Sequence, residues 1–216
     1  MAHETLNDLM LDELQDVYDA EHQITKALPK MIEVASSMDL KQAFQLHLEQ
    51  TEGQILRLEQ VFELMGEEAK RKPCKAMKGL LAEGEDLIKD HDASVLLDAG
   101  LIGSAQRVEH YEIAAYGTIC AYAEALGEQE IAGLLQQTLD EEKQTDQSLS
   151  ELSVPINQQS AQEATSRNGG NAKKSTNDAK KDSNKGSNQD ANKKSNQDSN
   201  QDSNKGSGSK SGKGSN

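Results

Sequence analysis

The chain has 216 residues and a net charge of −14, and this charge is divided unevenly along it. Residues 156–216 carry eleven Lys and Arg against six Asp and Glu, which leaves twelve against thirty-one in residues 1–155. An acidic body of about 150 residues has the size of one domain, attracts cations and repels nucleic acid. The N-terminus lacks a basic leader with an apolar run, and no apolar run is long enough for a bilayer, so we expect a cytoplasmic protein.

The first predicted helix covers residues 4–36. Apolar side chains recur there every three or four positions, which is the spacing of one face of a helix. Glu21 lies within this apolar stripe, near the middle of the helix. Pro29 has no amide hydrogen for the preceding turn, so we expect a kink or a break at that position.

The second predicted helix covers residues 40–65. Asp39 and Gln42 have the spacing of an N-terminal capping pair, and Gly66 is typical of a helix end. Near the centre of this helix, His47 lies at the edge of the apolar face. The first two helices therefore each bring a polar side chain to their midpoint.

A shorter helix at residues 73–89, with Pro73 in its first turn, is expected to be a crossover segment. A long helix over residues 93–126 follows, and Glu112 lies in the middle of its apolar stripe, with Glu109 one turn earlier. An isolated buried carboxylate is costly, so Glu112 must reach water, pair with a cation or bind a metal. Small residues on its opposite face suit either a solvent face or a subunit contact: Gly103, Ala114, Gly117 and Ala121.

The last predicted helix covers residues 128–152. Glu142 lies in the middle of its apolar stripe, with Asp146 beside it, and Pro155 is expected to end the ordered part. Residues 156–216 consist almost entirely of Asn, Ser, Lys, Gln, Asp and Gly, with recurring fragments. Such a segment has too little apolar surface to offset the entropy of folding, so we predict a disordered tail after a single domain at residues 1–155.

Four long helices with short turns and one crossover predict an all-α four-helix bundle, in which the helix midpoints come close together. We therefore predict a dinuclear metal site in the core, and carboxylates with an imidazole favour iron or manganese over zinc. Each acid taken alone has a simpler interpretation as a solvated surface group. The candidate ligands are Glu21, His47, Glu109, Glu112, Glu142 and Asp146.

The usual di-iron bundle takes one Glu from each of two helices and a Glu-x-x-His pair from each of the other two. This sequence does not match that pattern literally. It has Glu109-x-x-Glu112 on one helix and His47-x-x-Gln50 on another, while Glu142 is followed four residues later by Asp146.

Four segments nevertheless resemble the YciE/YciF family of bacterial stress proteins, a ferritin-like group, and the resemblance covers about residues 4–153. These segments are Tyr18-Asp19-Ala20-Glu21-His22-Gln23, His47-Leu48-Glu49-Gln50-Thr51, Val108-Glu109-His110-Tyr111-Glu112-Ile113-Ala114 and Thr138-Leu139-Asp140-Glu141-Glu142-Lys143 with Asp146. The resemblance implies a ferritin-like bundle, a homodimer and a site similar to those of rubrerythrin-type di-metal proteins. Family members usually have Glu where this chain has Gln50, which implies a weakened or mononuclear site if that position is a ligand.

Two functions from different classes remain open. The first is a stress protein whose core di-iron or di-manganese site handles peroxide or O₂, with no catalytic residue assigned. The second is a non-enzymatic dimeric scaffold with a vestigial metal site. Paired lysines in the tail could bind a polyanion such as nucleic acid, but the interspersed aspartates favour a solvating role. Neither function involves a membrane.

Overall fold

The computed structural model describes the backbone of residues 4–175 and the side chains of residues 4–166. This part of the chain contains five helices and no strand, which confirms the all-α prediction. The helices are α1 (Leu6–Val34), α2 (Met38–Met65), α3 (Lys75–Asp90), α4 (Val95–Leu126) and α5 (Gln129–Ser175).

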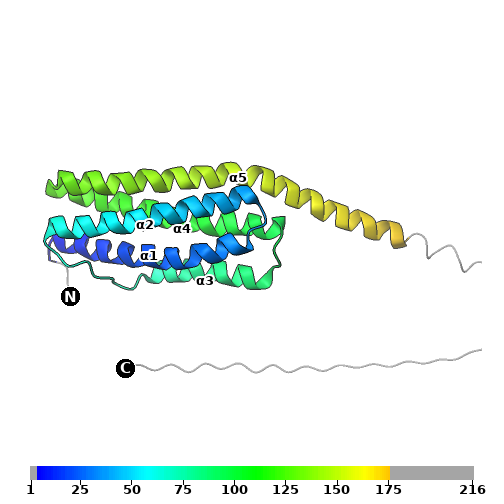
Figure 1. The fold of residues 1–216 in the computed structure, drawn as a ribbon, viewed down its shortest axis with the longest axis horizontal. Helices are drawn as coiled ribbons and strands as arrows, with labels where there is room; N and C mark the ends of the chain where they lie inside the picture. The colour runs from blue at the N-terminus through cyan, green and yellow to red at the C-terminus, as the bar shows by residue number, and fades with distance from the viewer. Residues whose placement is uncertain (1–3, 176–216) are drawn as a thin grey trace, which may run out of the picture. The chain divides into compact units, whose positions relative to one another are not determined.

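The four long helices form a bundle, and the short helix α3 is the crossover (Figure 1). Short turns join α1 to α2 and α4 to α5, so the helices of each pair run in opposite directions. Between α2 and α4 the chain returns along the bundle through α3, so these two helices run in the same direction. This is the predicted ferritin-like arrangement, with a long connection in the middle of the sequence.

The caps of α2 and α4 show how the sequence ends and begins these helices. The Ser37 hydroxyl accepts a hydrogen bond from the Leu40 amide and caps α2, so the predicted Asp39 cap is wrong. Asp39 lies instead in the first turn, where a carboxylate interacts favourably with the helix dipole. Gly66 and Gly127 end α2 and α4 at φ values of 70° and 81°, a left-handed conformation that glycine adopts without steric cost.

Neither proline breaks its helix. Pro29 lies inside the continuous helix α1, and Pro155 lies inside α5, so the predicted end of the last helix at residue 152 is wrong. Ile156, directly after Pro155, is buried in the apolar core. Burial of that side chain offsets the backbone hydrogen bond that proline cannot make. The predicted disordered tail lies largely outside the described residues.

The core consists of two apolar clusters, one toward each end of the bundle. The Phe62 cluster includes Met10, Leu14, Phe62, Ile119 and Leu135. The Phe44 cluster includes Ile24, Phe44, Leu97, Leu101 and Leu149, together with Met77 of the crossover helix. Along each long helix, a short stretch of buried polar residues separates the two clusters. None of the described helices is both long enough and apolar enough to cross a membrane.

Candidate metal centre

Five buried ionisable residues occupy the layer between the two clusters. Glu21 comes from α1, His47 from α2, Glu109 and Glu112 from α4, and Glu142 from α5. Each is at most 3% exposed. They are buried because each has helical spacing from the apolar residues of its own helix, so the packing that buries the stripe also buries the acid.

Four of these residues converge on one point. His47, Glu109, Glu112 and Glu142 each offer one ligand atom, and these atoms all lie within 4.8 Å of one another. Bonds from a metal to oxygen or nitrogen are about 2.0–2.2 Å long, so two ligands on opposite sides of an ion are about 4.2 Å apart. Small side-chain movements would therefore close the group around a single ion.

Burial changes the protonation of the whole group. Desolvation is the largest cause that raises the pKa values of Glu21, Glu109 and Glu112 well above the usual carboxyl range, and the nearby Glu142 charge adds to it. Desolvation also raises the pKa of Glu142 and lowers the pKa of His47 to about 4. Without a cation, the layer is therefore driven toward neutral carboxylic acids and a neutral imidazole.

Many polar atoms of this layer have no hydrogen-bond partner within the described structure when the carboxyl groups are ionised; once protonated, Glu21 pairs with Glu112 and Glu109 with Glu142. The unpartnered atoms include both carboxylate oxygens of Glu112, one oxygen each of Glu21, Glu109 and Glu142, and both ring nitrogens of His47. His47 Nε2 is nevertheless 3.3 Å from Glu109 Oε1. Buried polar groups are nearly always paired, so unpartnered atoms in one place indicate that a ligand belongs there.

Glu21 lies outside the four-residue group but beside it. Its Oε1 accepts a hydrogen bond of 2.5 Å from the Tyr116 hydroxyl, and its other oxygen is unpartnered. Its charge raises the pKa of Glu112, which places the two carboxyl groups close together. Glu21 is therefore positioned to add a carboxylate oxygen to the group or to hold a proton next to it.

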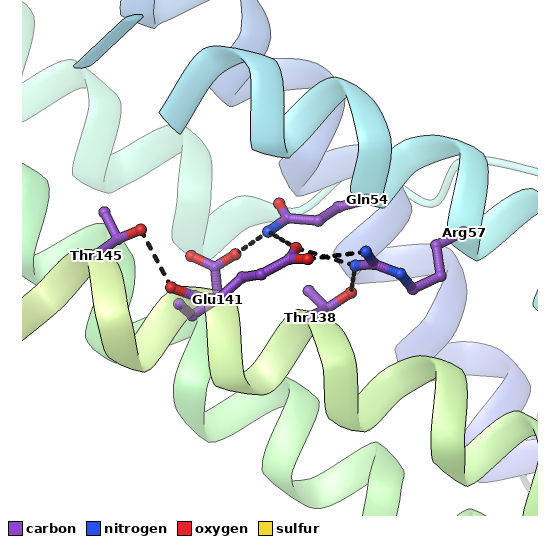
Figure 2. Close-up of polar contacts among 6 residues, drawn as sticks. Gln54, Arg57, Thr138, Glu141 and Thr145 are labelled. Carbon is purple, nitrogen blue, oxygen red and sulfur yellow. Dashed lines mark hydrogen bonds and ion pairs between the residues drawn. The ribbon is translucent and has the colours of Figure 1, made fainter. Parts of the chain in front are cut away.

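A second set of polar contacts borders the group on the side of α5, and sequence reasoning did not find it (Figure 2). The Gln54 amide nitrogen donates to Glu142 Oε1 and, at 3.1 Å, to Glu141 Oε2. The Arg57 guanidinium donates to both oxygens of Glu141, at 3.0 and 2.9 Å, and to the Thr138 hydroxyl at 2.6 Å. The sequence spacing could have indicated Gln54, because it is seven residues after His47 and therefore lies on the same face of α2.

The remaining predicted ligand, Asp146, is at the edge of the site. Its Oδ1 accepts a hydrogen bond from Gln106 and lies 3.3 Å from His110 Nε2. It adds to the negative potential at Glu109 but is not part of the four-residue group. Gln50 is only half-buried, whereas Thr51 and Gln54 are the fully buried α2 residues beside His47.

Two cavities lie between α1, α3 and α4 and lead toward the site. The outer one, of about 70 Å³, has exposed charged residues at its rim and apolar residues below them. The inner one, of about 20 Å³, is lined by His47, Glu109 and apolar side chains. Five residues line both cavities: Ala27, Met31, Leu81, Ala105 and Val108. The cavities are therefore neighbours, and the inner one touches two members of the metal-ligand group.

Comparison with known proteins gives a consistent result. The family described as "Domain of unknown function (DUF892)" matches residues 5–162. Protein YciF of Escherichia coli strain K12 is 45% identical over 155 residues, which are 71% of this chain and 93% of that protein. This relative confirms the resemblance to the YciE/YciF family.

Two solved structures share the fold at high sequence identity. The crystal structure of the E. coli stress protein YciF has a TM-score of 0.69 and 44% identity, covering 71% of this chain and 98% of that chain. YcfI from Rhodopseudomonas palustris has a TM-score of 0.67 and 46% identity, covering 68% and 94%.

Proposed function

Because the chain belongs to the DUF892 family, in which an E. coli relative is described as a stress protein, we propose that it is a stress-response protein with a metal centre in its bundle core. His47, Glu109, Glu112 and Glu142 would hold the ion, and Glu21 would complete the set. One observation carries this proposal. Four buried side chains place a ligand atom each within 4.8 Å of one another, and several of their oxygens and nitrogens have no hydrogen-bond partner among the described residues.

The donor set supports iron or manganese. Three or four carboxylates with one imidazole match hard to borderline divalent ions, whereas structural zinc sites use more Cys and His. The two free cysteines, Cys74 and Cys120, are buried outside the group. A divalent cation would neutralise charges that the low-dielectric core otherwise forces into the protonated state.

Such an ion would supply an open coordination position and a redox couple for a small oxidant such as O₂ or peroxide. The residues of the chain would position the ion, exclude water and hold a proton. The carboxylates would orient the ion, the two apolar clusters would exclude bulk water, and Glu21 with Tyr116 would hold a proton beside the group.

The test is the metal content of the full-length chain, purified without a tag from cells supplied with iron and manganese. We expect about one ion per chain in the natural protein, and its loss in His47→Ala and Glu112→Ala. Glu49→Ala is the matched control, because Glu49 is exposed on the same helix. If both site variants keep the metal of the natural protein, the assignment of the ligands is wrong.

A second function is favoured by a different observation. Gln54 and Tyr116 already bond two of the carboxylates, and α2 exposes three leucines, Leu46, Leu56 and Leu64. A dimeric scaffold whose polar core is held by protons and hydrogen bonds rather than by metal would have both features. It predicts a dimer whose melting temperature is unchanged by chelators, whereas bound metal adds stability through linkage. Light scattering and thermal melts with and without chelator separate the two functions.

A further inference from the structure

The two cavities under the crossover helix form an apolar passage to the centre. α3 covers α1 and α4 at this place, and Leu81 of α3 forms a wall of both cavities. On the opposite wall, Ala27 of α1 and Ala105 of α4 leave space where larger side chains would close it. The inner cavity ends at the side chains of His47 and Glu109.

From this geometry we propose that a small apolar molecule, with dioxygen as the physiological ligand, reaches the metal centre through the passage between α1, α3 and α4. This inference rests on the proposed metal centre for its function, but the passage itself belongs to the protein without metal.

The lining selects against polar oxidants. Apart from His47 and Glu109, every residue of the inner cavity is apolar. A peroxide molecule or an anion would lose hydrogen bonds to water on entering, and that loss is costly when nothing replaces them. Dioxygen makes no strong hydrogen bonds, so its transfer into the passage carries no such penalty.

The size of the inner cavity fits the same ligand class. The inner cavity, of about 20 Å³, exceeds the roughly 10–15 Å³ that one water molecule needs, so one diatomic molecule fits with small adjustments. A drug-sized ligand or a peptide would not fit.

Two flexible side chains lie where the cavities meet. Met31 and Leu81 are both half-buried and line both cavities. An unbranched methionine changes rotamer easily and adapts to irregular space. Rotamer changes on the nanosecond scale would open the junction without any movement of a helix.

The test uses dissolved oxygen as a paramagnetic probe of the full-length, chelated protein. Methyl-labelled protein is placed under oxygen or argon pressure, and the added relaxation of each methyl group is measured. We expect strong added relaxation at Ala105 and Val108, which are 6% and 7% exposed, beyond that of Leu139 and Ala132, which are 6% and 8% exposed in the Phe62 cluster. Equal relaxation in the two regions would overturn the passage.

Two variants locate the route. Ala105→Leu should fill the junction, with loss of the added relaxation at Ile24 and Leu28, which line the inner cavity and not the outer one. Ala82→Leu is the control, because Ala82 is exposed on α3 and lines neither cavity of the passage. Unchanged relaxation in Ala105→Leu, with the fold intact by circular dichroism, would also overturn the proposal.

A failure of the passage can be told from a failure of the proposed function. Methyl relaxation is measured without metal, so it decides the passage even if the chain binds no ion. Metal binding without oxygen entry would leave the metal centre standing and overturn only the route. Oxygen entry without metal binding would support the passage and remove the proposed metal centre.

Discussion

At the scale of single residues, Gln54 and Arg57 lie where a second set of metal ligands would be needed. A di-iron bundle needs two Glu-x-x-His pairs facing the core. On α2 the core-facing pair three residues apart is Thr51 and Gln54, and on α5 it is Glu142 and Thr145. The Gln54 amide donates a hydrogen bond to Glu142, and this bond and the nearby Arg57 charge only partly offset the desolvation that raises the pKa of Glu142.

We therefore predict one ion per chain rather than two. The double variant Thr51→Glu with Gln54→His restores one Glu-x-x-His pair and should raise the metal content to about two ions per chain. Elemental analysis against protein concentration measures this directly. Gln50→Glu is the matched control and should leave one ion, because residue 50 is only half-buried. Two ions in the natural protein would contradict the prediction.

At the scale of helices, Asp98 joins the α1–α2 turn to the first turn of α4. Its carboxylate is fully buried and accepts hydrogen bonds from the amides of Ser36 and Ser37, at 2.7 and 2.8 Å. These amides lie at the end of α1 and the start of α2. One side chain therefore links the first helical hairpin to α4, which carries Glu109 and Glu112.

Asp98→Ala should lower the free energy of unfolding by about 3 kcal/mol, because the part-buried amides of Ser36 and Ser37 lose a charged acceptor. Urea unfolding followed by circular dichroism measures the loss. Asp92→Ala is a suitable control, since Asp92 is exposed just before α4, and it should change stability by less than about 0.5 kcal/mol. Equal stability of the two variants would show that the turn is held by other contacts.

At the scale of the whole molecule, the polar layer makes stability depend on pH and on metal. The raised pKa values of Glu21, Glu109, Glu112 and Glu142 mean that the folded chain binds more protons than the unfolded chain above the usual carboxyl pKa. The stability that these four carboxyl groups contribute is complete below the usual carboxyl pKa, and it is lost as the pH rises toward their raised pKa values in the folded chain. The lowered pKa of His47 acts in the opposite direction between about 4 and its ordinary value, but it is one group against four.

We predict that the chelated protein melts at a lower temperature at pH 7 than at pH 5, by at least about 5 °C. Each carboxyl group that stays protonated only in the folded chain lowers the free energy of unfolding by about 1.4 kcal/mol per pH unit. A loss of 1 kcal/mol lowers the melting temperature by about 2–4 °C in a domain of this size. Added Mn²⁺ should reverse the trend, because it replaces protons on the same ligands. Glu112→Gln should flatten the pH dependence, and an equally steep dependence in that variant would exclude the layer as its source.

Much of the fold could be predicted because its signals are local. Each long helix carries its own apolar stripe, and Gly66 and Gly127 end two of them at left-handed positions. The same stripes place an acid or a histidine at every helix midpoint, so the candidate ligands could be named before any contact was known. A helical period depends only on neighbouring residues, and one sequence contains that information in full.

The tertiary structure alone decided which polar groups meet. Tyr116 bonds Glu21 across 95 residues and Gln54 bonds Glu142 across 88, while Asp146 turns to Gln106 and His110 at the edge. The continuation of α5 past Pro155 likewise depends on burial of Ile156 against helices far away in the sequence. These outcomes depend on how helices rotate and slide against one another, and that is settled by the packing of whole helix faces rather than by the residues of any one helix.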